Sequence, residues 1–311
     1  MRRSLGIGLA LAAALAVLFW AQLKPLALWA ARRHNGCPLK ACLEAPALDR
    51  AHRRARERIQ NSLRIMRRDP AGFQLWHTPH GPLWSPQRRH DAFWLADLLA
   101  EADAGPYSHG AVGVRHGDIV LDGGAHIGVF TRQALAAGAA LVIAVEPAPS
   151  NVECLRRNLT AEIAARRVRV YPKGLWHRQE TLRLTTDDNT SLGDSLILPR
   201  GASGIQVPLV PIDDLVQELA LPRVDFIKLD IEGAEQEALT GARQTLARFR
   251  PRLAISAYHK GDDTLRIPSI VRAACPGYRL TPGPCLIEKR RLVPKVLFFE
   301  PSPEPARAHL R

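Results

Sequence analysis

The amino-acid sequence predicts a doubly wound α/β fold, in which helices cover both faces of a mostly parallel sheet. Two observations support this prediction. Short apolar runs alternate with helix-forming segments of about 10 to 15 residues over positions 119–299, and a glycine-rich turn follows the first run. Such alternation implies right-handed crossovers and therefore parallel strand pairing. A length of 311 residues leaves room for one such core and an N-terminal extension.

The predicted elements follow one another in a regular order. The run Ile119-Val120-Leu121 is the first strand, residues 122–128 form a glycine turn, and a helix follows over 129–137. Further strands are predicted at residues 141–145, 168–171, 226–229, 253–257 and 296–299, and helices at 93–102, 150–159 and 234–247. Residues 187–204 are rich in Asp, Ser, Thr and Gly, so we expect an exposed loop there, before a segment at 207–212.

An uncharged apolar stretch lies near the start of the chain. The twenty residues from Ser4 to Leu23 are long enough, as a helix, to span about 30 Å of hydrocarbon. A cleaved signal peptide is the alternative, because two arginines precede the stretch and residues 14–16 have a small-x-small pattern. The run continues through Trp20, beyond a usual signal core, which favours an uncleaved single-pass membrane anchor. Lys and Arg are more numerous after the span than before it, so we expect the body in the cytoplasm.

Positive charge is concentrated in the front third of the chain. Residues 1–100 contain 16 Lys and Arg against 6 Asp and Glu, whereas residues 101–311 contain 27 against 24. Eight arginines fall within residues 50–68, where apolar residues spaced by three or four predict an amphipathic helix that ends before Pro70. This helix either packs against the body as a solvated charged helix or lies on anionic headgroups. Because the charge does not lie on the predicted body, we expect a membrane partner and no nucleic acid.

The five cysteines are too few for a disulfide scaffold, and their number is odd. We expect reduced, mostly buried thiols, although Cys37 and Cys42 could form a bridge in an oxidising compartment. The sequence contains no second close pair to complete a zinc site, so we assign no metal.

The glycine turn and two acidic residues form the candidate cofactor site. A nucleotide-like ligand of an open α/β sheet binds beyond the carboxyl ends of the strands, where glycines let the backbone approach it. Gly123, Gly124 and Gly128 occupy such a turn, and Glu146 ends the next strand, where a carboxylate can accept hydrogen bonds from a ribose diol. Asp122 suits the cationic amino acid end of S-adenosyl-L-methionine but would repel the pyrophosphate of a nicotinamide dinucleotide. Its alternative role is to cap the following helix.

Several motifs make the chain similar to the FkbM-type methyltransferases, over about residues 73–299. The most specific is Asp225-Phe226-Ile227-Lys228-Leu229-Asp230-Ile231-Glu232-Gly233-Ala234-Glu235. The others are the turn at residues 120–128, Val145-Glu146-Pro147-Ala148-Pro149, Asn158-Leu159, Ile212-Asp213-Asp214-Leu215, and residues 254–260 with Asp262-Asp263 and Ile267-Pro268.

This resemblance implies a Rossmann-like, doubly wound, seven-stranded methyltransferase sheet with a final antiparallel strand. The usual reaction of such enzymes is methyl transfer to a hydroxyl oxygen of a sugar, polyketide or other small acceptor. We therefore divide the chain into a membrane anchor at 1–24, a basic linker with its amphipathic helix at 25–72, and a methyltransferase domain at 73–311.

The resemblance also implies roles for individual residues. Asp122, Gly123, Gly124 and Gly128 would hold the methionine end of the cofactor, and Glu146 the ribose. Leu175 and Trp176 lie where such folds contact adenine. His126 departs from the family pattern, which commonly has Asn there. Its ring either lines the cofactor pocket or packs at the start of the helix.

Three residues are candidates for the base that takes the proton of the acceptor. Asp230, Glu232 and His259 should cluster past the carboxyl ends of the fourth and fifth strands. We expect burial and neighbouring carboxylates to raise the pKa of Asp230, and His259 to titrate near neutrality. Glu232 could instead cap the next helix, Asp230 could orient the cofactor or the acceptor, and His259 could only complete a hydrogen bond at the strand end. The rival function is a membrane-bound binding or assembly protein that keeps the fold without turnover.

Overall fold

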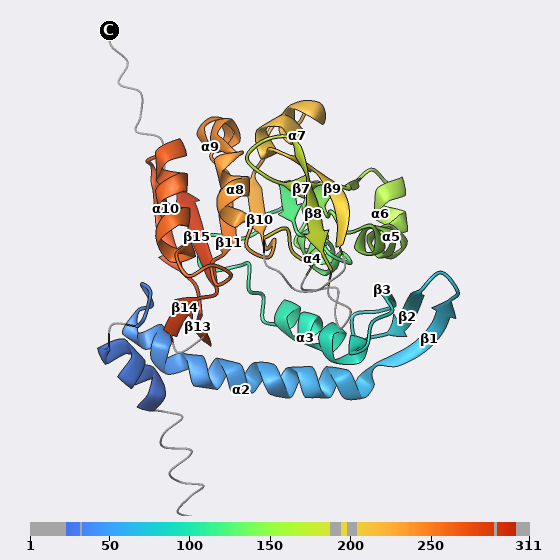
Figure 1. The fold of residues 1–311 in the computed structure, drawn as a ribbon, viewed down its shortest axis with the longest axis horizontal. Coiled ribbons are helices and arrows are strands. Elements are labelled where there is room, and N and C mark those ends of the chain that lie inside the picture. The colour runs from blue at the N-terminus through green and yellow to red at the C-terminus, as the bar shows by residue number, and fades with distance from the viewer. Residues whose placement is uncertain (1–22, 32, 187–193, 198–203, 289–290, 303–311) are drawn as a thin grey trace, which may run out of the picture.

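The computed structural model describes residues 23–31, 33–186, 194–197, 204–288 and 291–302, and its centre is a seven-stranded sheet (Figure 1). The strand order is β12-β15-β11-β10-β4-β5-β6. Their bounds are β4 Ile119–Gly123, β5 Leu141–Val145, β6 Val168–Tyr171, β10 Phe226–Leu229, β11 Arg252–Ser256, β12 Tyr278–Pro282 and β15 Val296–Pro301. Strands β4, β5, β6, β10 and β11 pair in parallel, and β15 runs antiparallel to β11 and β12. The predicted sheet and its final antiparallel strand are confirmed.

Two apolar cores lie on opposite faces of this sheet because successive side chains of a strand alternate in direction. One core joins Leu121 and Ile143 to α7 Ile212–Glu218, α8 Glu235–Thr240, α9 Arg243–Phe249 and α10 Asp263–Ala274. The other joins Val120 and Val142 to α4 Val129–Ala136 and α5 Pro149–Asn158, which a short helix, α6 Thr160–Ala164, follows. Helices therefore cover both faces, as the sequence predicted.

The helix predicted at 234–247 is divided into α8 and α9. A Cβ added at Gly241 would lie 2.2 Å from the carbonyl oxygen of Trp176, so the backbones approach closely at the break. The second helix has its own cap, because Asp213 accepts hydrogen bonds from the backbone N–H groups of Gln244 and Thr245.

The N-terminal part departs most from the prediction. The helix expected at 50–68 is α2, Leu39–Ser62, and residues 64–69 form a strand, β1 Arg64–Asp69. The helix ends because Leu63 is extended and β1 pairs antiparallel with β2 Phe73–His77, which pairs with β3 Leu83–Pro86. Backbone pairing with β2 thus overrides the helical spacing of the side chains.

Helix α2 packs on the body through its apolar face. In Figure 1 it runs along one side of the molecule, next to α3 Asp91–Asp103. Ile59 lies in one cluster with Leu95 and Leu99 of α3. The carboxylate of Asp97 accepts from His52 at 2.9 Å and from Arg56 at 3.5 Å. The packing expected in the first of the two alternatives for this helix is thus observed, while its other side exposes charged residues together with Leu39, Leu43 and Leu48.

Two small sheets complete the fold. One has the order β7-β9-β8, with β7 Gly174–Leu175, β8 Glu180–Thr185 and β9 Gly204–Val210. The other is a hairpin of β13 Cys285–Glu288 and β14 Arg291–Pro294. Most of the loop predicted at 187–204 lies outside the described residues, but Ser195 forms a β-bridge with Thr185.

The described residues contain no helix that is both long and apolar enough to cross a membrane. Of the predicted span at residues 4–23, only Leu23 belongs to the described part of the chain. The transmembrane part of the predicted fold is therefore unsupported.

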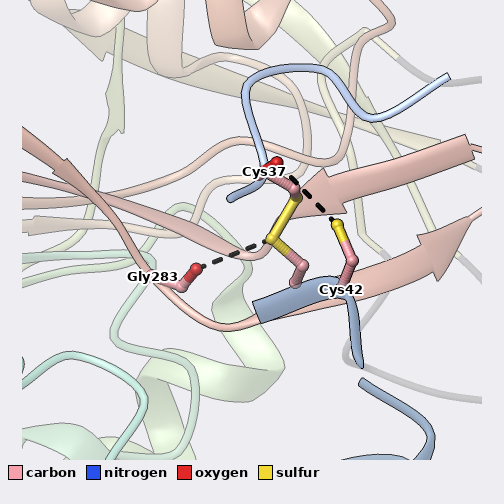
Figure 2. The surroundings of a disulfide bond; sticks show 4 residues. Cys37, Cys42 and Gly283 are labelled. Carbon is pink, nitrogen blue, oxygen red and sulfur yellow. Dashed lines mark hydrogen bonds between the residues drawn. A yellow bond between two sulfur atoms is a disulfide. The ribbon is translucent and has the colours of Figure 1, made fainter. Parts of the chain in front are cut away.

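A disulfide bond joins Cys37 to Cys285 and so ties the segment before α2 to the hairpin β13–β14 (Figure 2). Cys42 is a buried free thiol that lies beside this bond, with its Sγ 3.8 Å from the carbonyl oxygen of Cys37. The expectation of reduced thiols was therefore wrong for Cys37, and so was its suggested partner. The error has a simple cause, since the two bonded residues are 248 positions apart and no local spacing relates them.

We predict that removing this bond destabilises the protein. The Cys285→Ser variant should lose up to about 5 kcal/mol of unfolding free energy, because the crosslink restricts the unfolded chain. Melting curves with and without reductant check this: reductant should lower the melting temperature of the parent protein and leave that of the variant unchanged. Equal responses of the two proteins, or a non-reducing peptide map without a Cys37–Cys285 pair, would contradict it.

Candidate active site

A cavity of about 300 Å³ opens at the carboxyl ends of β4, β5 and β10. Gly124, Glu146 and Asp230, which directly follow these strands, all line it. Helix α3 forms the opposite wall with Trp94 and Glu101. Ligands of open α/β sheets bind at this edge, so the cavity is the candidate active site.

The turn after β4 forms the floor of the cavity, and its shape requires glycine at position 124. Gly124 has a φ of +75°, and an added Cβ would lie 1.9 Å from the carbonyl oxygen of Asp230. Gly128, with a φ of +94°, precedes the first residue of α4. His126 also has a positive φ, +51°, which a residue with a side chain adopts at a cost of about 1 to 3 kcal/mol. Such strained positions cluster at functional sites.

Glu146 is held by three donors inside this floor. Its Oε2 accepts from the backbone N–H of His126 at 2.9 Å. Its Oε1 accepts from the N–H of Ala148 at 3.0 Å and from Nδ2 of Asn151 at 3.3 Å. Burial raises the pKa of Glu146, and these donors act in the opposite direction. Of the roughly four acceptor sites of the carboxylate, these donors leave one on Oε2, which can receive a hydroxyl of a ribose.

Asp122 lies beneath the cavity and does not line it. Its side chain is fully buried, its Oδ2 accepts from Thr131 at 2.7 Å, and Nζ of Lys228 lies 3.1 Å from its Oδ1. Lys228 also donates to the carbonyl oxygens of Gly123 and Gly124, at 3.0 and 2.8 Å, and does line the cavity. The predicted contact of Asp122 with the methionine end stays a prediction.

His126 lines the cavity as a neutral ring. Burial lowers its pKa to about 3, and the neighbouring ammonium group of Lys228 acts in the same direction. The ring can therefore offer shape and a hydrogen bond at neutral pH, but no positive charge. Of the two alternatives for His126, the structure favours the one that lines the pocket.

The pKa of Asp230 is lowered, contrary to the sequence-based expectation that it is raised. Its burial raises the pKa, but the nearby cations Lys228 and His259 and the hydroxyl of Tyr107 together bring it below its ordinary value. The Tyr107 hydroxyl donates to Asp230 Oδ2 at 2.7 Å. The expectation was wrong because it counted the carboxylates around Asp230 and not the cations.

His259 lies behind the cavity wall, and its side chain is only 2% exposed. Its Nδ1 lies 3.0 Å from Oε1 of Glu235, and its Nε2 lies 3.7 Å from both Asp230 Oδ1 and Glu232 Oε2. Burial lowers its pKa, but the three carboxylates raise it well above the ordinary value. The expected titration near neutrality was therefore wrong. Of the three proposed bases, Asp230 and Glu232 line the cavity and His259 does not.

The two residues predicted beside adenine differ in position. Leu175, in β7, lines the cavity next to Lys173 and Gly174. Trp176 does not line it and packs in a separate cluster with Leu184 and Leu209. Their roles toward the cofactor stay predictions.

Sequence reasoning gave no role to several residues that line the site. Lys228 could have been found, because a lysine between Phe226 and Leu229 in a predicted buried strand needs a buried anionic partner. Tyr107 and Trp94 carried no comparable signal, since their place on the cavity depends on how α3 packs.

The fold and the cavity define the class of this protein: it has the fold of S-adenosylmethionine-dependent methyltransferases. Residues 122–280, about half of the chain, match the family model of the methyltransferase FkbM domain. The chain belongs to this family, which confirms the resemblance drawn from its motifs.

Individual relatives cover only parts of the chain. Methyltransferase sdnD of Sordaria araneosa is 30% identical over 154 residues, which are 39% of this chain and 59% of that protein. The chain thus matches less than two thirds of its curated relative. A solved structure, methyltransferase FkbM from Methylobacillus flagellatus KT, is 23% identical with a TM-score of 0.47. The matched region is 68% of this chain and 54% of the chain in that structure. The structure of an O-methyltransferase from Bacillus cereus in complex with SAH is 14% identical with a TM-score of 0.37. The matched region is 66% of this chain and 88% of the chain in that structure.

We predict that Glu146→Ala weakens binding of S-adenosylmethionine at least tenfold. Each lost hydrogen bond to a charged acceptor costs about 1.5 to 3 kcal/mol, and about 1.4 kcal/mol is a factor of ten. Titration calorimetry checks this, with Glu57→Gln on the exposed face of α2 as the control. Equal affinity of the Glu146 variant, with an unchanged melting temperature, would remove Glu146 from the site.

Proposed function

We propose that this protein is an S-adenosylmethionine-dependent O-methyltransferase that methylates a hydroxyl of a sugar, glycan or other small acceptor. The observation that carries the proposal is the position of Asp230. It lies between the turn with Gly124 and Glu146, which suits the cofactor, and the wall of α3. A methyl group held at the turn and an acceptor held at the wall would meet beside this carboxylate.

The methyl group of a sulfonium is already activated, so the enzyme must chiefly align the acceptor with it. Alignment alone can supply about 7 to 11 kcal/mol. The acceptor oxygen forms a bond to the methyl carbon while the carbon–sulfur bond breaks and its electron pair stays on sulfur. Asp230 and Glu232 are the two predicted bases that can accept the hydroxyl proton within the cavity.

The acceptor wall suits a polyhydroxylated ring. Trp94 is half-buried on this wall, and Glu101 lies about two turns further along the same helix. An aromatic face packs against the apolar C–H groups of a sugar, while carboxylates accept hydrogen bonds from its hydroxyls. This combination supports a sugar or glycan over a purely apolar acceptor.

We predict that Asp230→Asn keeps S-adenosylmethionine affinity within a few-fold and lowers turnover about a hundredfold or more, because proton transfer by a positioned base is worth about 10²- to 10⁴-fold. The assay incubates the purified protein and methyl-labelled cofactor with extracts of cells that lack the protein.

The chemical stability of the labelled product tests the proposed function independently of the Asp230 variant. An O-methyl ether should survive alkaline hydrolysis, whereas a methyl ester would not. Cofactor binding with no labelled product from any extract would support the rival function, a binding or assembly protein. Full turnover by the Asp230 variant would place the base elsewhere.

We also propose that the basic N-terminal segment holds the catalytic domain at an anionic membrane surface, next to the predicted anchor. β1 exposes Arg64, Arg67 and Arg68, and its apolar residues Ile65 and Met66 are 39% and 57% exposed. Cationic side chains beside exposed apolar ones are typical of surfaces that lie on anionic headgroups.

Vesicle co-sedimentation tests this surface. We expect the protein to bind vesicles that contain phosphatidylserine, and the triple variant Arg64→Gln, Arg67→Gln, Arg68→Gln to bind less, by about 1 kcal/mol per residue. Equal binding to vesicles of phosphatidylcholine alone would contradict it.

The predicted cytoplasmic body and the Cys37–Cys285 bond favour opposite redox environments, so the state of this bond in cells would report the side of the membrane.

A further inference from the structure

Four ionisable side chains meet at the acceptor end of the cavity. Asp230, Glu232 and Glu235 follow β10, and His259 follows β11. Asp230, Glu235 and His259 each offer one ligand atom, and these atoms lie within 4.8 Å of one another. The side chains of His259 and Glu235 are 2% and 0% exposed, whereas those of Asp230 and Glu232 are 23% and 20% exposed and line the cavity.

Glu235 fixes the orientation of the imidazole ring. Its Oε1 accepts from the backbone N–H of Ile231 at 2.9 Å and lies 3.0 Å from Nδ1 of His259. A carboxylate in this position accepts a hydrogen bond from Nδ1–H and so points Nε2 toward the other carboxylates, where a metal ion could replace the Nε2 proton. Carboxylate–histidine pairs of this kind commonly orient the histidines of metal sites.

The other side of the ring faces two carboxylates at a distance too long for hydrogen bonds. Nε2 lies 3.7 Å from Asp230 Oδ1 and 3.7 Å from Glu232 Oε2. The atoms His259 Nε2, Asp230 Oδ1 and Glu235 Oε2 are buried and lack a hydrogen bond of ordinary length among the described residues, although the side chains of Glu232 and Ser256 act on His259 and Asp230. Buried polar atoms in this state commonly have a further partner, such as a water molecule or an ion.

The spacing and the charge of these atoms suit a cation. Two ligand atoms at about 2.1 Å from one ion are roughly 3.0 to 3.4 Å apart, so atoms 3.7 Å apart need to move only slightly. Three carboxylates surround this imidazole, while Lys228, which also lowers the pKa of Asp230, is shared with Asp122. A divalent ion that replaces the imidazole proton would add one positive charge among these carboxylates.

We propose that His259, Asp230 and Glu232 bind a divalent metal ion, with Glu235 as the positioning residue that orients the histidine. One imidazole and two carboxylates are ligands suited to Mn²⁺ or Zn²⁺. No metal was expected from the sequence, because that expectation considered only cysteine pairs.

The position of the ion suggests its role, and this step rests on the proposed O-methyl transfer. Asp230 and Glu232 line the cavity, so a metal bound between them would be within reach of the acceptor hydroxyl. A bound cation lowers the pKa of a coordinated hydroxyl, so with the metal in place Asp230 and Glu232 would act as its ligands instead of as the base, and the hydroxyl would release its proton to water before or during transfer of the methyl group.

The test measures metal binding without acceptor or cofactor. After treatment with chelator and dialysis, the full chain is titrated with MnCl₂, and bound Mn²⁺ is followed by electron paramagnetic resonance. We expect His259→Ala and Asp230→Asn to lose specific binding, and Glu235→Gln to weaken it by about 10- to 100-fold. Glu237→Gln is the matched control, because this carboxylate also belongs to α8 but pairs with His177 at 2.8 Å.

Cofactor binding separates a lost site from a lost fold. Each variant should bind S-adenosylmethionine within a few-fold of the parent protein. The proposal is overturned if the parent does not bind Mn²⁺ in the titration, or if His259→Ala binds it equally well. Metal binding without methyl transfer to any acceptor would instead contradict the proposed function and leave the metal site standing.

Discussion

The ammonium group of Lys228 connects the two parts of the site, and the rest of the cavity depends on this contact. Lys228 in β10 is the neighbour of Asp122 in the parallel register of β4. Its Nζ pairs with that carboxylate and donates to two carbonyl oxygens of the glycine turn. Burial lowers the pKa of His126 most and the Lys228 charge adds to this, while the same charge, with His259 and Tyr107, lowers the pKa of Asp230. One buried cation thus sets the shape of the cofactor floor and the charge of the acceptor end.

The acceptor wall is built by a part of the chain that the family match does not include. Helix α3 precedes residue 122, where the match begins, and it is held in place by α2. Asp97 of α3 accepts hydrogen bonds from His52 and Arg56 of α2. Membership of the family therefore describes the cofactor half of the cavity better than the acceptor half, because function depends on the site and not on the fold alone.

The predictable part of the structure is the part governed by local pattern. The predicted strands at 141–145, 168–171 and 226–229 agree with β5, β6 and β10 residue for residue, since each is a short, mostly apolar run with clear ends, interrupted only by Arg169 in β6 and Lys228 in β10. Residues 64–69 were mistaken for helix because their spacing suits a helix, and only pairing with β2 makes them a strand.

The candidate site was predictable to a similar extent. Gly124, Glu146 and Asp230 follow strand ends, and parallel strands bring their carboxyl ends to one edge, so their convergence could be inferred. The charge states could not, because the pKa values of Asp230 and His259 depend on distances between side chains of different strands. The bond between Cys37 and Cys285 is the extreme case of such a distant relation.

That bond also constrains the order in which the protein can be completed. Cys37 leaves the ribosome long before Cys285, and until then the nearest thiol along the chain is that of Cys42. Closing so short a loop is entropically easier than closing one of 248 residues. A nascent chain in an oxidising environment would therefore favour the wrong pair first. Native pairing then requires a thiolate to reopen that bond by exchange once the hairpin with Cys285 has been made.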